Sequence, residues 1–463
     1  MRDNDSIFTA ASRPQPSPPA FRGSTALGVV DPACHPGQTG YGGDRSRIAV
    51  AGRSIDRMRV MLLNYEYPPL GGGAGIATRC LAESLAELGV LVDVVCGGLD
   101  PLRRSGAMSA PVRGSADVAL ASSRSGQRPG LRVFRVQTLR RELHSAGMAV
   151  GASYVLNARP VVKCLLRDAR YDVVHFFFSL PTGALLPLAK RAGVGTVLSL
   201  RGSDVPGYDM TKSGLQAAHR ILRPLTRSIW RRADRVVAVC TSLGDLARET
   251  MPDLEFEVIG NGVDLENFRP RSDRREKGSP VRCLAVSRLI ERKALDTLLH
   301  AFKRLPAEGF RLTVAGSGAA ELSLRDLARS LGLEDIVRFV GAVPNAELAD
   351  YHREADVFVL VPRTEAFGNV FAEAAAAGLP VVGSAVGGVK DLVEPGVNGL
   401  LVSPDDPEGT AAAIARLADD ELRTEMGRRN RAMAEKRLSW EAVTASYMSV
   451  YRELRERPRP AVA

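Results

Sequence analysis

Short apolar runs alternate with amphipathic stretches along most of the chain. In the first half these strand-like runs are RVMLLNY, LVDVVCG, LRVFRVQ, DVVHFFF, GTVLSL and RVVAVC. In the second half they are VRCLAVS, FRLTVAG, VRFVG, VFVLV, PVVGS and GLLV. Strands that alternate with helical patterns are typical of parallel α/β folding, so we predict two doubly wound α/β domains.

The predicted boundaries follow changes in composition. Residues 1–57 are rich in Pro, Gly and Arg, and we expect a disordered N-terminal extension. The polar run at 268–280 has the composition of a linker, which gives domains at 58–268 and 269–438. A final amphipathic helix is predicted within 439–457. We expect a surface insertion at Gly98–Gly130.

The composition is that of a globular protein, with 45% hydrophobic and 25% charged residues. The apolar segment 173–189 contains a histidine and two prolines, so we favour a strand, a turn and a helix over a membrane span. The six cysteines show no metal-ligand or redox spacing, which favours buried free thiols in a reducing compartment. We therefore expect a cytoplasmic protein.

The net charge of +10 is concentrated in the first half. Residues 58–264 carry 26 Lys and Arg against 18 Asp and Glu, whereas the residues from 265 onward carry 29 of each. An anionic surface or ligand facing the first half would explain this split. Residues 220–235 interleave arginines with Leu, Ile and Trp230, which suits peripheral contact with an anionic membrane. An ordinary helix with one buried stripe explains the segment equally well, and no nucleic-acid motif accompanies the charge.

Two acids flank a glycine turn in RTEAFGNVFAEAAAAGLP, between a buried strand and a helix. Such turns lie at the carboxyl edge of an α/β sheet, where helix-terminal N–H groups attract anions. Glu365 could accept hydrogen bonds from sugar hydroxyls, and Glu373 could bind a vicinal diol such as ribose. Alternatively, Glu365 is a first-turn acid favoured by the helix dipole and Glu373 a solvated helix acid.

Arg288 and Lys293 follow another strand and could neutralise a diphosphate. Cations at a helix amino end are unfavourable unless an anion is present, although exposed surface charges remain an alternative. Gly71–Gly73 follow the first strand and would let backbone N–H groups approach a phosphate or sugar, or form a flexible connector. The glycines at 316–318 lack the spacing of a dinucleotide fingerprint.

The chain resembles the retaining, nucleotide-sugar-dependent glycosyltransferases of family 4. The resemblance covers about 58–454 and is carried by PPLGGGAG, RGSD, NGVDLENFRP, SRLIERK, the two spaced glutamates and the SWEAV helix. It implies the GT-B fold, in which two Rossmann-like domains face each other and the final helix crosses back to the first. Residues 58–268 would then face the acceptor and residues 269–438 would bind the nucleotide sugar.

The resemblance also implies roles for individual residues. Arg288 and Lys293 would hold the donor diphosphate, and Glu373 would bind the ribose. Glu365 and the backbone of Ala366, Phe367 and Gly368 would bind the sugar, and Gly72 and Gly73 would close the pocket from the other domain. Of these, Arg288, Lys293 and Glu365 would be the catalytic residues.

Three residues are expected on the acceptor side: His175, Arg201 and Asp204. The family's His-x-His reads His175-Phe176-Phe177 here, and its His-Gly-x-Asp begins with Arg201 in place of the histidine. These departures leave the acceptor open. His175 could equally be a core histidine, and Asp204 could equally cap a turn.

The expected reaction is transfer of a sugar from a nucleotide diphosphate sugar to a hydroxyl of a glycan or lipid-linked acceptor. Cell-envelope or exopolysaccharide synthesis is the expected context. The family needs no divalent metal or other cofactor, and no DxD-type motif lies in a plausible place. The alternatives are a nucleotide-sugar epimerase of the same fold or a non-catalytic nucleotide-sugar-binding protein.

Overall fold

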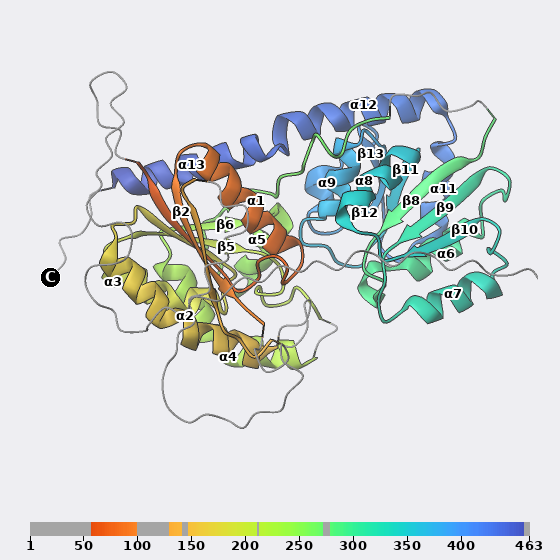
Figure 1. Cartoon of the computed structure of the whole chain (residues 1–463). Coiled ribbons are helices and arrows are strands. Elements are labelled where there is room, and N and C mark those ends of the chain that lie inside the picture. Colours follow the sequence, from red (N-terminus) through yellow and green to blue (C-terminus); the bar gives the residue numbers. More distant parts are fainter. Residues whose placement is uncertain (1–56, 100–128, 141–146, 211–212, 272–277, 458–463) are drawn as a thin grey trace, which may run out of the picture. The chain divides into compact units, whose positions relative to one another are not determined.

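The computed structural model describes residues 57–99, 129–140, 147–210, 213–271 and 278–457. These residues form two parallel β-sheets, one in each half of the chain, with helices packed against both (Figure 1). The predicted tail at 1–57 lies outside the described residues except for its last residue, as does most of the predicted insertion at 98–130. The predicted linker is described only at its two ends.

The first sheet has seven parallel strands in the order β3-β2-β1-β4-β5-β6-β7. Its strands are β1 Arg59–Asn64, β2 Leu91–Gly97, β3 Leu131–Val136, β4 Val173–Phe177, β5 Gly195–Leu200, β6 Arg235–Ala238 and β7 Glu257–Val258. The order reverses beside β1, where chain segments on the two sides of the strand diverge. Such switch points are where open α/β sheets bind ligands.

The second sheet has six parallel strands in the order β10-β9-β8-β11-β12-β13. Its strands are β8 Val281–Val286, β9 Phe310–Ala315, β10 Val337–Gly341, β11 Val357–Leu360, β12 Val381–Ser384 and β13 Gly399–Val402. All twelve predicted strands are therefore confirmed, and the two-residue strand β7 was not predicted.

Most strands are joined by helices. Those of the first half are α1 Gly73–Glu87, α2 Met148–Asp168, η2 Thr182–Leu185, α3 Leu186–Arg191, α4 Ser213–Arg232 and α5 Thr241–Thr250. Those of the second half are η3 Glu291–Lys293, α6 Leu295–Phe302, α7 Glu321–Ser330, α8 Asn345–Glu354, α9 Asn369–Ala376, α10 Val389–Leu392, α11 Pro407–Arg416 and α12 Asp420–Arg437. The last helix is α13 Trp440–Glu456.

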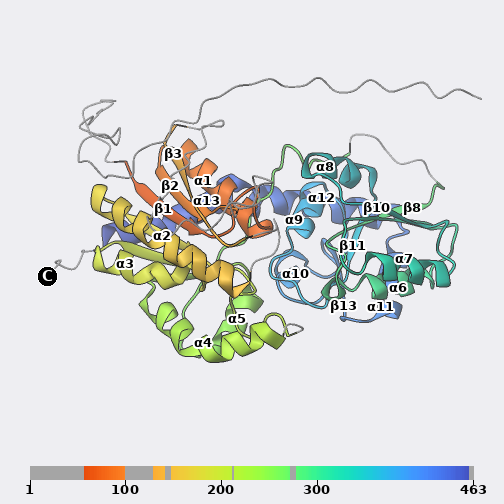
Figure 2. The same ribbon diagram turned by 60° about the horizontal axis from the view of Figure 1, so that its bottom comes forward.

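The alternation of side chains along β1 separates the two faces of the first sheet. Met61 and Leu63 belong to the buried cluster that contains side chains of α2, α3 and α4. Val60 and Leu62 belong to the cluster that contains side chains of α1 and α13. The figures show the same layers, with α1 and α13 on one side of the sheet and α2, α3 and α4 on the other (Figure 2).

The final helix crosses back onto the first sheet, as the sequence predicts. Ser439 caps α13 by accepting a hydrogen bond from Ala442 N, and Ser439 also bridges Val263 at the end of the first half. Tyr447 and Tyr451 are buried against β4 and β5. This packing confirms the predicted GT-B arrangement, whereas the exact domain boundaries stay a prediction.

The apolar segment at 173–189 forms β4, the turn η2 and the start of α3. This is the strand, turn and helix that its composition favoured. Among the described residues, no helix is both long and apolar enough to cross a bilayer. The described cysteines are free thiols, and Cys96, Cys240 and Cys283 are buried.

Candidate active site

A cavity of about 400 Å³ lies at the carboxyl ends of strands from both sheets. It is lined by Gly73, Ala74, Arg201, Ser203, Tyr208, Asp209, Val239, Asn261, Val286, Ser287, Arg288, Arg292, Lys293, Glu365, Ala366, Phe367, Gly368, Asn369 and Val370. Eight predicted site residues are thus brought together: Gly73, Arg201, Arg288, Lys293, Glu365, Ala366, Phe367 and Gly368. Gly72, Glu373, His175 and Asp204 are not among the lining residues.

The glycine turn before α9 forms one wall of this cavity. Gly368 has a φ of +87° and is the N-cap of α9, a backbone conformation that side chains with a Cβ disfavour. The carbonyl of Ala366 accepts a hydrogen bond from Gly388 N, which fixes the turn against the next loop. The turn therefore places the start of α9, with Asn369 and Val370, against the cavity.

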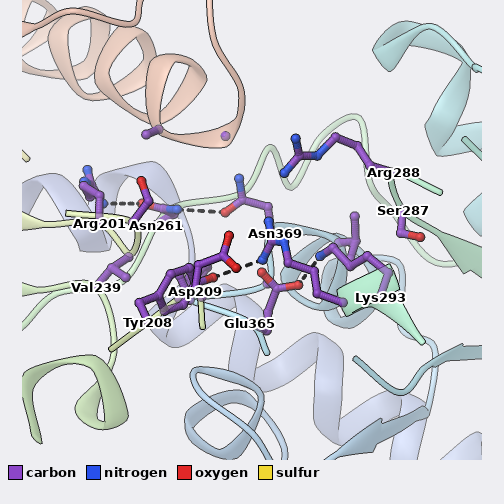
Figure 3. A pocket seen from close by; sticks show the side chains of 18 of the residues that line it. Arg201, Tyr208, Asp209, Val239, Asn261, Ser287, Arg288, Lys293, Glu365 and Asn369 are labelled. Atoms are coloured by element: carbon purple, nitrogen blue, oxygen red, sulfur yellow. Dashed lines mark hydrogen bonds and ion pairs between the residues drawn. The ribbon is translucent and has the colours of Figure 1, made fainter. Parts of the chain in front are cut away.

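Lys293 and Glu365 form an ion pair inside the cavity (Figure 3). Both side chains are largely buried, Lys293 at the end of η3 and Glu365 in the loop after β11. Removing two charges from water is costly, so such a pair is stable only with good geometry and further hydrogen bonds. The pair holds the predicted phosphate-binding ammonium beside the predicted sugar-binding carboxylate.

Arg288 lies opposite this pair, just after β8 (Figure 3). The neighbouring Arg292 donates a hydrogen bond of 3.3 Å to the hydroxyl of Tyr208. Burial, followed by the charge of Glu365, raises the pKa of Tyr208 to about 12, so this phenol is neutral at pH 7. The cavity thus carries three cations from one loop, Arg288, Arg292 and Lys293, and Lys293 forms an ion pair with Glu365.

Glu373 lies on α9 one turn beyond Val370, which lines the cavity. Its Oε2 atom is buried and accepts no hydrogen bond from the described residues, although the residue as a whole is partly exposed. Burial raises the pKa of Glu373 to about 7. A buried carboxylate oxygen without a donor is unusual in native proteins and indicates a site where a ligand can donate.

Three polar side chains form a row across the cavity (Figure 3). Arg201 donates to Asn261 Oδ1 at 2.8 Å, and Asn261 Nδ2 donates to Asn369 Oδ1 at 2.8 Å. Gly73 lies so close to the Asn369 amide that an added Cβ would clash with it. This row joins the loops of the first sheet to the start of α9.

His175 does not reach the cavity, which corrects its predicted acceptor-side position. It is fully buried on β4, where Nδ1 lies 2.7 Å from Tyr451 Oη and Nε2 lies 2.7 Å from Ser199 Oγ. Burial, and then the charge of Arg201, hold the pKa of His175 well below its usual value. It is a satisfied core histidine that helps to dock α13.

Asp204 is likewise a turn residue whose side chain lies outside the cavity. Its carboxylate accepts hydrogen bonds from the backbone N–H groups of Ser179, Arg201 and Gly202 and from the Ser179 hydroxyl. It therefore fixes the loop that carries Arg201 into the cavity. Gly72 lies just outside, as the N-cap of α1.

Sequence reasoning missed several lining residues. Tyr208 and Asp209 lie in an irregular segment after β5 that has no periodic pattern. Asn261 lies in the segment NGVDLENFRP, for which no site role was predicted, and Asn369 directly follows the predicted glycine turn. The signal that could have found Asn369 is its place at the first position of α9, where polar side chains face the ligand edge. Within the described part of the chain, no group of three or more His, Cys, Asp or Glu could hold a metal ion.

Comparison with known proteins shows the family of this chain. Residues 72–262 match the model of the glycosyl transferase 4-like domain, and residues 266–433 match glycosyl transferases group 1. The chain is 29% identical to glycogen synthase of Mycobacterium tuberculosis, over 85% of this chain and 94% of the relative. It is 31% identical to the GDP-mannose-dependent alpha-(1-6)-phosphatidylinositol monomannoside mannosyltransferase of the same species, over 61% and 76%. The structure of sucrose-phosphate synthase from Thermosynechococcus elongatus superposes with a TM-score of 0.70 at 26% identity, over 86% of this chain and 99% of that one. This chain therefore belongs to the family 4 glycosyltransferases, enzymes of the GT-B fold that transfer a sugar from a nucleotide sugar.

Proposed function

We propose that the enzyme transfers a sugar, with retention of anomeric configuration, from a nucleotide diphosphate sugar to a hydroxyl of a glycan or lipid-linked acceptor. The observation that carries the proposal is the buried Lys293–Glu365 pair facing Arg288 in one cavity. A diphosphate needs cations and a sugar needs hydrogen-bond acceptors. Both are present here within the reach of one ligand.

The donor diphosphate would lie between Arg288 and Lys293. Departure of the nucleoside diphosphate builds negative charge on the leaving oxygen. Fixed cations in a partly desolvated cavity stabilise that charge more in the transition state than in the bound donor. The first N–H groups of α9 would add to this stabilisation.

Donor binding would also rearrange the ion pair. Once the diphosphate engages the Lys293 ammonium, the Glu365 carboxylate is free to accept hydrogen bonds from the sugar hydroxyls. Glu373 would accept from the ribose, and the row from Arg201 to Asn369 would support the sugar side of the cavity. Gly73 would close the cavity from the first half.

Retention would require the acceptor hydroxyl to attack on the face that the diphosphate leaves. The leaving phosphate oxygen then lies close enough to take the acceptor's proton. We assign no side chain as the general base. His175 and Asp204, which are engaged elsewhere, are not needed in this scheme.

The proposal includes no metal ion or organic cofactor. Arg288, Lys293 and the start of α9 would supply the charge neutralisation that the leaving group requires. The nucleotide sugar is a co-substrate.

The names of relatives and the positive charge of the first half support a glycan or lipid-linked acceptor. The names of the two bacterial relatives refer to glycogen and to a phosphatidylinositol mannoside, one a glycan and the other a lipid. The basic first half of this chain fits an acceptor held at an anionic surface, such as the inner face of the cell membrane. Synthesis of a cell-envelope glycan or exopolysaccharide would be the biological context.

A donor panel tests the proposal. UDP-, GDP- and ADP-linked glucose and mannose are incubated with the enzyme in EDTA, and release of the nucleoside diphosphate is measured with and without glycan and lipid acceptors. We expect slow hydrolysis of one donor, faster release with acceptor, and retained configuration in the product by NMR.

Two outcomes would contradict the proposal. Isomerisation of the donor without nucleotide release would identify an epimerase of the same fold. Activity that EDTA abolishes and added Mg²⁺ or Mn²⁺ restores would show that the two cations do not suffice.

A further inference from the structure

The outer surface of α2 and α4 carries an unusual share of the exposed apolar side chains. Among the described residues, eleven large apolar side chains are exposed, and six of them lie on these two helices or in the segments just before them. These six are Leu139, Met148, Leu156, Met210, Ile221 and Leu225. We call this surface the α2–α4 face.

The helical spacing places these residues away from the core. In α4 the buried residues are Ala218, Thr226, Ile229 and Trp230, whereas Ile221 is 76% exposed and Leu225, one turn later, is 43% exposed. In α2, Met148 and Leu156 lie two turns apart and are 70% and 71% exposed. Both helices therefore have an apolar stripe toward solvent in addition to the one that packs on the sheet.

Within the predicted membrane segment at 220–235, Trp230 does not lie at the surface. Trp230 is buried and donates a hydrogen bond of 2.8 Å from Nε1 to Ser179 Oγ. It anchors α4 to the protein and cannot contact a bilayer. The exposed large apolar residues of this helix are Ile221 and Leu225, which lie near its middle.

The charge around the face is positive. Helix α4 contains five arginines and no acid, and Arg220, Arg223, Arg231 and Arg232 are exposed. Helix α2 adds the exposed Arg159 and Lys163. Apolar side chains interspersed with cations match a bilayer that has anionic headgroups, because the apolar groups enter the boundary region while the cations remain among the headgroups.

Helices α2 and α4 lie on the same side of the first sheet (Figure 2), and buried side chains of both belong to the core beneath them. Gly151 of α2 packs on Pro181, and Gly183 of η2 packs on Ile229 of α4, so the helices flank the same turn. Met210 directly follows Asp209, which lines the active-site cavity. Docking through this face would bring the cavity close to the surface.

We infer that the α2–α4 face docks the enzyme on an anionic lipid bilayer. Exposed apolar side chains that gather on one side of a protein are typical of an interaction site. The inference deepens the proposed function, on which it rests for the lipid-linked acceptor, by naming the surface from which that acceptor would be reached. The docking itself involves no catalytic residue.

Vesicle flotation tests the inference with the full-length protein. Vesicles of 30% phosphatidylglycerol in phosphatidylcholine are compared with pure phosphatidylcholine. We expect binding to the anionic vesicles only, weakening as salt rises from about 0.05 to 0.5 M because the headgroup attraction is screened. The double substitution Ile221→Asn/Leu225→Asn should reduce the partition coefficient at least tenfold, and Arg220→Gln/Arg223→Gln should do the same at low salt.

Leu322→Asn is the matched control, because Leu322 is 79% exposed on α7 of the second half. It should bind vesicles like the wild type. Hydrolysis of the donor in the absence of vesicles should be unchanged in every variant, which separates a failure of docking from a failure of the proposed function. Equal binding by the Ile221→Asn/Leu225→Asn and Leu322→Asn variants would overturn the inference, as would a wild-type protein that does not float with anionic vesicles.

Discussion

At the scale of single residues, the central feature is the ion pair between Lys293 and Glu365. These two side chains form an ion pair in the cavity, so neither charge is buried without a partner. A diphosphate ligand that binds the Lys293 ammonium would leave the Glu365 carboxylate without its partner. The same ligand must therefore donate hydrogen bonds to Glu365. The hydroxyls of a sugar would supply them, so under the proposed function a nucleotide sugar would pair with both residues and a nucleotide alone with only one.

Glu373 gives a prediction for pH dependence. Its pKa of about 7 means that the carboxyl group is mostly neutral at pH 6 and mostly ionised at pH 8. Only the ionised form can accept two strong hydrogen bonds from the ribose diol, so nucleoside diphosphate binding should tighten by up to about tenfold over this range. Titration calorimetry at several pH values measures this effect.

The variant Glu373→Gln is the control for that titration. It retains the ionisation of the ligand's own phosphate but lacks the titrating carboxyl group, so its affinity should change less with pH than that of the wild type. Identical pH profiles for the two proteins would rule out a ribose contact by Glu373.

Sequence patterns located some site residues better than others. Arg288, Lys293 and Glu365 were predicted to lie together because each follows a buried strand and strand ends meet at one edge of a sheet, and all three line the cavity. Tyr208 and Asp209 were missed because an irregular loop has no period to interpret. His175 was misplaced because a polar residue within an apolar strand is equally compatible with a core hydrogen-bond network, which is what Tyr451 and Ser199 provide.

At the scale of elements, the join between η3 and α6 fixes Lys293. The next residue, Ala294, has a φ of +50°, the left-handed conformation that favours glycine. An L-residue there is strained by about 1 to 2 kcal/mol. The surrounding packing enforces this conformation, because Ala294 is buried and is also the N-cap of α6.

Replacing this alanine tests the strain. Ala294→Gly relieves the strained φ but loses a buried methyl group, so we expect the free energy of unfolding to change by less than about 0.5 kcal/mol. Ala301→Gly, at an equally buried position with ordinary helical geometry in α6, should lose about 1 to 2 kcal/mol. Urea denaturation of both variants makes the comparison, and equal losses would show that Ala294 is unstrained.

The strands were predictable because a buried parallel strand is a short, continuous apolar run, which its length, its β-branched residues and its flanking turn residues distinguish from a buried helix. Strand β7 was missed because both of its residues are exposed at the edge of the sheet. Helix α4 shows the limit of the same reasoning. Its composition indicated an amphipathic helix, but only packing decides that Trp230 is buried and Ile221 exposed.

At the scale of the whole molecule, the active-site cavity needs loops from both sheets. The first half supplies Gly73, Arg201 and Asn261, and the second half supplies the cations and the glycine turn. The hydrogen bond between Asn261 and Asn369 connects the two sets. Neither half alone therefore lines the whole cavity.

The binding of the donor diphosphate by Arg288 and Lys293 is tested most directly by calorimetry. The ligands are the nucleoside diphosphate of the preferred donor and its monophosphate. Arg288→Ala and Lys293→Ala are compared with wild type and with Arg338→Ala, an exposed arginine on β10 outside the cavity. If the two cations hold the diphosphate, each cavity variant loses about 1.5 to 3 kcal/mol of diphosphate binding while circular dichroism shows retained folding. The monophosphate is then affected much less, and Arg338→Ala binds like wild type. If the Arg288→Ala and Lys293→Ala variants bind the diphosphate as tightly as wild type, the two cations do not hold it.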